Sequence, residues 1–408
     1  MIPWTGVNST RYYANIANEM SDPHDSAALL TEHFGAGPEP AFISVPGRVN
    51  LIGEHVDYHG LPVLPMAIQR CVRISFRPRD DDRIRAVSLG YGEREFEWKS
   101  KLEPSASGDW ENYIKAAAQT VHDRWNVRRG IDAAVISDLP PAAGLSSSSA
   151  LLTGFSLALL QANRVRTTFG ELMEVLPEGE YFVGTRGGGM DHAAVLASKA
   201  GSALLIHFVP VSACPVPIPK DWAFLVAHSL TTAEKSGAVR AEYNLRRTAG
   251  TQALQRLGFS SYAAAIEGRT FDELETIAGE RLEGDEQRCF LHVAGEALRT
   301  TAAVTALRAA DASTFGRLLN ESHASLRDLL RVSNGALDEL VDTARDAGAL
   351  GARLTGAGFG GCAVVFCHSS TRQRVAEILM RRYYSERPGF DPSTHLIAVE
   401  PSAGAFDV

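Results

Sequence analysis

The sequence has 408 residues, of which 45% are hydrophobic and 22% are charged. This composition is typical of a folded globular protein and excludes a largely disordered chain, and the length favours two domains. The formal net charge of -8 argues against a general nucleic-acid binder, although a nucleotide ligand needs only a local cluster of donors and a few cations.

The cysteines and the first residues bear on the cellular location. The five cysteines are scattered and form no CxxC pair, so we expect reduced thiols and no zinc site. The first residues lack the basic start and apolar core of a signal peptide, and no stretch approaches about 18 uninterrupted apolar residues. We therefore predict a soluble, cytoplasmic protein with neither a membrane nor a nucleic acid as partner.

In chain order, the apolar runs and turn-formers predict a mixed α+β protein rather than regular βαβ alternation. Residues 41–78 predict strands, interrupted by the turn-former PGR, around the polar loop EHVDYHG. Residues 131–163 predict a strand, a Gly/Ser-rich loop and a long helix that begins near Ser147. Residues 184–206 predict a glycine loop, a short helix and a strand.

The second half of the chain is mainly helical in pattern. Clustered prolines make residues 210–219 a candidate linker, so we predict one domain over residues 1–210 and another over residues 211–408. Residues 235–347 have helical spacing. The tail returns to a turn and a strand, followed by a helix over residues 371–384.

The stretch LPPAAGLSSSSALL, residues 139–152, indicates a phosphate site. Gly144 permits a tight turn, and the serines supply hydroxyls and amides where a helix begins, so its N-terminal amides and dipole favour an anion. A serine hydroxyl there can also reach a phosphate-bound Mg²⁺. The alternatives are a serine linker or a plain helix cap. The chain has no GxxxxGK[ST], so this loop is not a standard P-loop.

The stretch GAGFGG, residues 356–361, matches the letters of GxGxxG. A strand-like CAVVF follows it instead of the helix that receives a pyrophosphate, so a dinucleotide fold is disfavoured. A turn that approaches a bound phosphate or sugar fits the pattern better, and a purely structural hairpin turn is the alternative.

Two further stretches carry polar groups suited to a small ligand. GRVNLIGEHVDYHG, residues 47–60, holds short carboxylates and imidazoles that can fix a sugar's hydroxyls. A metal site of His55, Asp57 and His59, or an ordinary surface loop, is the alternative. GGGMDH, residues 187–192, places Asp191 after three glycines, where it is either an acceptor for a hydroxyl proton or an N-cap.

Together these stretches resemble the three signature motifs of the GHMP kinases, and VPGRVNLIGEHVDYHGLPVLPMAI is specifically similar to the galactokinase signature. WENYIKA and AEYNLRR resemble two further segments of that family, in the family's order. The resemblance implies a two-lobed GHMP kinase fold, with an N-terminal lobe like ribosomal S5 domain 2, a ferredoxin-like α/β C-terminal lobe and the active site in the cleft. It also implies ATP and Mg²⁺, a sugar substrate, and a monomer or weak homo-oligomer.

The resemblance also assigns roles by matching positions. Arg48 and Asp191 match the catalytic arginine and aspartate, the latter as general base or electrostatic partner for the C1 hydroxyl. The matches to sugar-contacting positions are Glu54, His55, Asp57, Gly188, Gly189 and Tyr243. The matches to the phosphate loop are Pro141, Ala143, Gly144, Leu145, Ser146, Ser147, Ser148 and Ser149. Ser147 or Ser148 is expected near Mg²⁺, and Ser148 and Glu180 are the expected ligands, with Glu178 as the alternative to Glu180.

The implied activity is phosphorylation of the anomeric C1 hydroxyl of galactose or a galactose-like sugar, within galactose metabolism. Some letters depart from the galactokinase pattern, because Ala142 replaces a glycine and His192 replaces a glutamine. PPxxGLSSSSAL and GTxGGGMD are more similar to the N-acetylgalactosamine kinase branch, which leaves the sugar open. A non-catalytic sugar and ATP sensor is disfavoured because Arg48, Asp191 and the serine loop are all intact.

Overall fold

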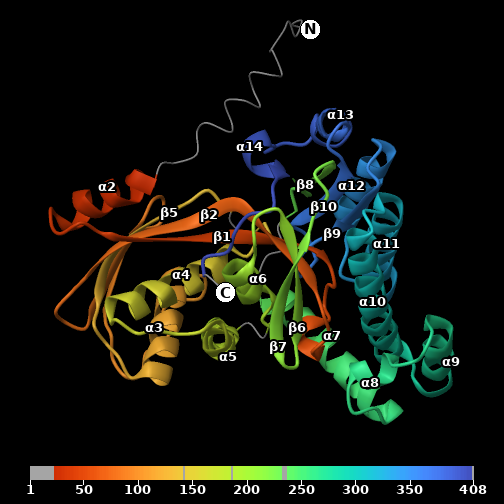
Figure 1. The fold of residues 1–408 in the computed structure, drawn as a ribbon, viewed down its shortest axis with the longest axis horizontal. Coiled ribbons are helices and arrows are strands. Elements are labelled where there is room, and N and C mark those ends of the chain that lie inside the picture. Colours follow the sequence, from red (N-terminus) through yellow and green to blue (C-terminus); the bar gives the residue numbers. More distant parts are fainter. Residues whose placement is uncertain (1–22, 141–142, 185–186, 232–236, 407–408) are drawn as a thin grey trace, which may run out of the picture.

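The computed structural model describes residues 23–140, 143–184, 187–231 and 237–406. Figure 1 shows two sheets, one on each side of the molecule, with a long green hairpin between them and helices on the outside of both. Strands and helices do not alternate regularly along the chain, and the predicted α+β class is confirmed. No helix in these ranges is both long enough and apolar enough to span a membrane.

The first sheet is built from the N-terminal part of the chain in the order β1-β2-β5-β3-β4. Its strands are β1 (Ala41–Ile52), β2 (Leu64–Pro78), β3 (Arg83–Ser88), β4 (Gly92–Glu97) and β5 (Ile131–Ser137). The predicted interruption at PGR is wrong, because β1 continues through it with a shift in register between Pro46 and Arg48. Gly47 serves close packing instead, since a Cβ there would lie 2.8 Å from the carbonyl oxygen of Leu145.

Helices cover both faces of this sheet. On one face α2 (Pro23–Phe34) packs Leu30 against Ala134 and Ile136 of β5. Because alternate residues of a strand point to opposite faces, Ala133 and Val135 face the main core instead. That core includes α3 (Glu111–Trp125), α4 (Ser147–Ala162), α5 (Phe169–Gly179) and α6 (Met190–Ala197). Helix α4 begins at the predicted residue, and α6 is the predicted short helix.

A two-stranded hairpin follows α6. It pairs β6 (Ser202–Phe208) with β7 (Val211–Pro217) along their full length. The proline-rich stretch is therefore an edge strand, where a missing N–H can be tolerated, and not an irregular linker. The domain boundary that we placed there stays a prediction.

The second sheet has the order β11-β8-β10-β9, and all its pairs are antiparallel. Its strands are β8 (Trp222–His228), β9 (Gly351–Leu354), β10 (Cys362–His368) and β11 (Leu396–Val399). The predicted helical region holds α7 (Gly237–Leu257), α8 (Tyr262–Ile266), α9 (Phe271–Arg281), α10 (Gly284–Arg308), α11 (Ala312–Ser325), the π-helix η3 (Leu326–Leu330) and α12 (Gly335–Asp346). The tail adds α13 (Arg372–Leu379), η4 (Met380–Tyr384) and α14 (Pro392–His395).

The end of the chain returns to the first half of the molecule. Ser402 donates its backbone N–H to Ala67 of β2, and Gly404 donates to Ser198 after α6, both within 3.0 Å. Ala405 and Phe406 donate their backbone N–H groups to Val195 and Leu196 of α6 at 2.8 and 3.0 Å. The last residues thus join the two halves of the fold on the side of the molecule that carries α6.

Candidate active site

A cavity of about 210 Å³ lies where the two sheets' loops meet. It is lined by the serine loop, the glycine loop before α6, the polar loop after β1, the start of α7 and the glycine turn between β9 and β10. The structure therefore brings all four chemistry-bearing stretches of the sequence to one place, including GAGFGG, whose residues Gly356, Ala357, Gly358, Gly360 and Gly361 line the cavity.

The serine loop presents the start of α4 to the cavity. Gly144 and Ser146 both have a positive φ, which turns the chain sharply into the helix. The side chain of the N-cap residue, Ser146, makes no hydrogen bond to the first turn of α4, which leaves the amides there for an anion in the cavity. Ser147 and Ser148 line this opening.

The other predicted members of the phosphate loop differ in what they offer. Ala143 and Leu145 are 1% exposed and sit in the core, so only their backbone can serve a ligand. Pro141 lies outside the described residues.

Arg48 and Asp191 meet beside the serine loop. Arg48 comes from β1 and is 5% exposed, and its Nε and Nη2 each lie 2.7 Å from Oδ1 of Asp191. The third nitrogen, Nη1, donates to the carbonyl of Gly144. Ser146 donates its hydroxyl to Oδ2 of Asp191 at 2.6 Å. Burial alone would raise the pKa of Asp191, but the Arg48 charge and these hydrogen bonds outweigh it and lower the pKa.

Glu180 lies next to this pair, close to the serine loop. Its Oε1 accepts the hydroxyl of Ser149 at 2.5 Å and lies 3.4 Å from Nε2 of His192. Burial raises the pKa of Glu180, but His192 and the Ser149 hydroxyl outweigh burial and lower it, so the side chain is an ionised carboxylate. Glu178 is exposed on the surface instead, which favours Glu180 among the two alternatives.

Asp57 and the glycine loop form the opposite wall. The N–H of Gly188 donates to Oδ2 of Asp57 at 3.1 Å. A Cβ on Gly188 would lie 2.4 Å from the backbone of Asp57 and Tyr58, so only glycine allows this approach. Burial, and then the negative charge of Asp191, raise the pKa of Asp57 to about 6. Gly189, with φ of 99°, caps α6 and also lines the cavity.

Three neighbouring rings, those of His55, Tyr58 and Tyr243, pack together beside Asp57 on this side of the cavity. His55 stacks at a tilt on Tyr243, with ring centroids 5.0 Å apart, and its Nδ1 lies 2.9 Å from the hydroxyl of Tyr58. Its Nε2 lies 3.2 Å from the carbonyl of Ala357, which makes Nε2 the donor and leaves Nδ1 to accept from Tyr58. Burial lowers the pKa of His55 to about 3, so the ring is neutral. His59 packs away from the cavity against Tyr262.

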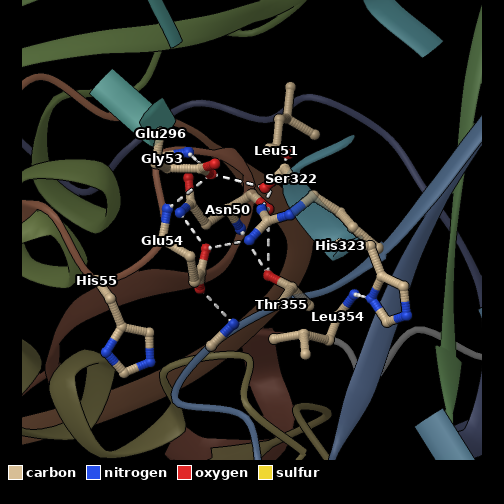
Figure 2. A network of polar contacts seen from close by, with 12 residues as sticks. Asn50, Leu51, Gly53, Glu54, His55, Glu296, Ser322, His323, Leu354 and Thr355 are labelled. Carbon is tan, nitrogen blue, oxygen red and sulfur yellow. Dashed lines mark hydrogen bonds and ion pairs between the residues drawn. The ribbon is translucent and has the colours of Figure 1, made fainter. Parts of the chain in front are cut away.

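Glu54 is held by protein donors from both halves of the fold. Its carboxylate accepts from Arg353 Nη2 at 3.0 Å, from the side chain of Asn50 and from the N–H of Gly356. Figure 2 shows Glu54, Asn50 and Thr355 converging on this buried network. Glu54 still reaches the cavity, at 2% exposure.

The sequence analysis missed several residues that line the cavity. Tyr113, Pro177, Val183 and Asn244 form apolar and amide surface there, and Thr355 lies at the base of the glycine turn. Tyr113 and Asn244 lie inside WENYIKA and AEYNLRR, so those stretches held the signal. Within the described residues no group of three or more His, Cys, Asp or Glu side chains is arranged to hold a metal, which removes support for a site at His55, Asp57 and His59.

Family models match three parts of the chain. The galactokinase galactose-binding signature matches residues 28–78, the GHMP kinase N-terminal domain matches residues 112–199 and the GHMP kinase C-terminal region matches residues 303–386. These segments carry the polar loop after β1, the serine and glycine loops, and the glycine turn.

Whole-chain comparisons agree. A galactokinase of Roseiflexus sp. (strain RS-1) is 35% identical over 371 residues, covering 90% of this chain and 93% of the relative. A galactokinase of Chloroflexus aurantiacus is 37% identical, covering 83% of this chain and 86% of the relative.

Solved structures have the same architecture. The structure of Lactococcus lactis galactokinase complexed with galactose has a TM-score of 0.83 at 26% identity, covering 94% of this chain and 99% of that chain. Methanococcus jannaschii mevalonate kinase, at 18% identity and a TM-score of 0.58, covers 85% of this chain and 96% of that chain and shows the shared fold. The chain therefore belongs to the galactokinase family and is an ATP-dependent sugar kinase with the GHMP kinase fold.

Proposed function

We propose that this chain transfers the γ-phosphate of MgATP to the C1 hydroxyl of galactose, giving galactose 1-phosphate and ADP. The observation that carries the proposal is the Arg48–Asp191 pair, which stands between the serine loop and the wall of Asp57, Gly188 and Tyr243 in one cavity. A phosphate donor on one side and a sugar on the other would meet at this pair. The galactokinases among the relatives, and the galactose in the L. lactis complex, support galactose as the sugar.

In this proposal Asp191 accepts a hydrogen bond from the C1 hydroxyl and orients its oxygen toward the γ-phosphate. Because Arg48 and Ser146 lower its pKa, Asp191 is a weak base at neutral pH. It takes the proton late, as the new P–O bond forms and the bond to the ADP oxygen breaks. Phosphoryl transfer has a loose transition state that depends on positioning and charge neutralisation more than on a strong base.

Arg48 supplies the cationic charge. All three of its nitrogens are bound by Asp191 and Gly144, so the guanidinium is fixed in place before any substrate arrives. We propose that it neutralises charge on the transferred group across a short distance without reorganising.

The oxygen atoms of Glu180 and Ser148 suit Mg²⁺ as ligands. Oxygen ligands suit this ion, which is commonly held through one or two carboxylates together with substrate phosphates. Glu180 is an ionised carboxylate at the cavity, and the Ser148 hydroxyl lines the same opening. When bound with ATP, the ion would neutralise the β- and γ-phosphates. Glu180 and Ser148 would hold it there, while Ser149 and His192 orient Glu180.

The test is ADP release with MgATP and a panel of galactose, N-acetylgalactosamine, glucose, arabinose and galacturonate. We expect galactose to be turned over best, and both Asp191→Asn and Arg48→Ala to lose most of the activity. Preference for N-acetylgalactosamine would move the chain to that branch. If the protein binds ATP and sugar but releases no ADP, it is not a kinase, and the alternative of a non-catalytic sensor for sugar and ATP takes its place. A cytoplasmic location and a monomeric or weakly associating state stay predictions.

A further inference from the structure

Arg353 is a fully buried cation beneath the sugar side of the cavity. It lies on β9, is 0% exposed, and directs Nη1 to the carbonyls of Asn50 and Leu51 at 3.1 and 3.0 Å. Its Nη2 donates to Glu54 Oε2 at 3.0 Å. With no exposed surface, Arg353 cannot contact a substrate itself. An effect on the reaction has to pass through these neighbours.

Stability alone is a weak reason for such a buried ion pair. Removing two charges from water costs about as much as their mutual attraction returns, and apolar replacements are often neutral or stabilising. The geometry points to orientation instead. A planar guanidinium binds several acceptors in fixed directions, so Arg353 sets the end of β1 and the carboxylate of Glu54 together.

Glu54 passes that orientation on to two segments that line the cavity, the polar loop after β1 and the glycine turn between β9 and β10. Its backbone N–H and that of Gly53 are fixed by Glu296 Oε1 at 3.3 and 3.0 Å, while its Oε1 accepts the N–H of Gly356. Gly356 belongs to the glycine turn that lines the cavity. The position of the polar loop relative to the glycine turn is therefore fixed through one carboxylate (Figure 2).

The count of acceptors shows what the carboxylate has left for a ligand. Burial raises the pKa of Glu54, and the charges of Arg353 and Arg48 oppose that rise. In its ionised form the carboxylate offers about four acceptor sites. Among the described residues three donors reach Glu54, from Arg353, Asn50 and Gly356. One site is left, on a carboxylate that borders the cavity.

We propose that Arg353 is a positioning residue for sugar recognition, which fixes the Glu54 carboxylate so that its remaining acceptor site meets a hydroxyl of the sugar. The proposal rests on the proposed function, because it needs a sugar in this cavity. It assigns Arg353 to the sugar half of the reaction and separates it from the ATP half, which is formed by the serine loop and Glu180.

The experiment compares Arg353→Lys and Arg353→Met with wild type. Lysine keeps the positive charge but lacks the planar guanidinium with its fixed donor directions. The Arg353→Lys variant can therefore be measured even if Arg353→Met does not fold. Galactose affinity is measured by calorimetry without nucleotide, together with the KM for each substrate and the melting temperature. We expect Arg353→Lys to weaken galactose binding and raise its KM about tenfold, with the ATP KM within about twofold of wild type. The panel sugar that wild type prefers replaces galactose if the two differ.

A matched control is Asp132→Asn, which removes the partner of Arg79 and Arg85 in the first sheet. It should lower the melting temperature with the galactose KM unchanged, and so separates lost stability from lost positioning. In a cycle with Glu54→Gln, the double variant should lose no more galactose affinity than the weaker-binding single variant, because both changes act through one carboxylate.

The results distinguish this proposal from the function it rests on. Wild type that binds and phosphorylates galactose, with Arg353→Lys unchanged in galactose affinity, overturns the positioning role alone. Equal losses for galactose and ATP, or fully additive losses with Glu54→Gln, also overturn it. Wild type that binds none of the sugars overturns both proposals.

Discussion

Arg48 and Asp191, 143 positions apart in the sequence, form an ion pair in which two arginine nitrogens lie 2.7 Å from the same carboxylate oxygen. Arg48 comes from β1 and Asp191 from the first turn of α6, and both are anchored further by Gly144 and Ser146 of the serine loop. The pair thus joins three of the chemistry-bearing stretches, and it keeps Asp191 ionised and correctly placed before substrates bind.

Asp191→Asn tests the role of this carboxylate. The amide keeps the shape but cannot accept the hydroxyl proton, so we expect kcat to fall about 10²- to 10⁴-fold, with the galactose KM changed far less. Steady-state kinetics with both substrates varied gives the two constants. Ser146→Ala, which removes one donor to Asp191 and leaves the charge, should show a smaller loss. An Asn variant that keeps a tenth of wild-type kcat would exclude Asp191 as proton acceptor.

Asp57 predicts a pH dependence of sugar binding. Burial and the charge of Asp191 raise its pKa to about 6, so it is a carboxylate above that pH and a neutral acid below it. A neutral acid accepts fewer hydroxyl hydrogen bonds, and we expect galactose affinity to decrease as the pH falls through about 6. The measurement is calorimetry of galactose across pH 5–8 without ATP, whose phosphates titrate in the same range.

The raised pKa of Asp57 also makes the stability of the fold depend on pH. The folded pKa of Asp57 lies above its usual value of 3.8, so the folded protein binds this proton more tightly than the unfolded chain does. Its contribution to the free energy of unfolding is therefore present below about pH 4 and is lost as the pH rises through about 6.

Asp57→Asn should remove the step in galactose affinity near pH 6. A step that persists in this variant would assign the titration to another group.

Gly188 and Gly187 provide a paired test of the glycine loop. A Cβ on Gly188 would lie 2.4 Å from backbone atoms of Asp57 and Tyr58, whereas one on Gly187 would come no nearer than 3.6 Å to Glu180 Oε2. We expect Gly188→Ala to displace the sugar wall and reduce kcat/KM for galactose about a hundredfold. Gly187 also lines the cavity, but a Cβ there would make only an ordinary van der Waals contact, so Gly187→Ala should change kcat/KM less than about threefold. Equal effects of the two substitutions would refute the close approach as the reason for glycine.

Local pattern in the sequence predicted the elements that depend on neighbouring residues. The start of α4 at Ser147 follows from a glycine, four serines and an apolar stripe in direct succession. Residues 356–361 lack a following helix, which identified a turn rather than a dinucleotide motif. These features are set within a few positions along the chain.

What the sequence could not predict depends on packing between distant segments. Gly47 looked like a turn residue, but in the fold it lets β1 pass close to Leu145. The prolines of β7 looked like a linker because no local signal shows that β6 offers a pairing edge. For the site, the resemblance supplied Arg48 and Asp191 as members, while the contacts of Arg353 and His192 became visible only in three dimensions.

His192 stands where the galactokinase pattern has a glutamine, and it contacts Glu180, the proposed Mg²⁺ ligand. Its ring is 1% exposed, with Nδ1 at 3.2 Å from the hydroxyl of Thr153 and Nε2 at 3.4 Å from Glu180. Removing the group that orients a metal ligand costs about 10- to 100-fold in metal affinity. We expect His192→Ala to raise the Mg²⁺ concentration for half-maximal activity by about this factor, and His192→Gln to restore most of the loss because an amide N–H can take the place of the Nε2 contact with Glu180.

A binding measurement separates this role from a general loss of structure. The ratio of ADP affinities with and without Mg²⁺ should fall in His192→Ala, since only the metal-dependent part of nucleotide binding uses Glu180. Glu178→Gln is the matched control, because this neighbouring carboxylate is exposed and should leave the ratio unchanged, whereas Glu180→Gln should abolish it. If His192→Ala weakens ADP equally with and without Mg²⁺, the histidine supports the fold of α6 and not the metal ligand.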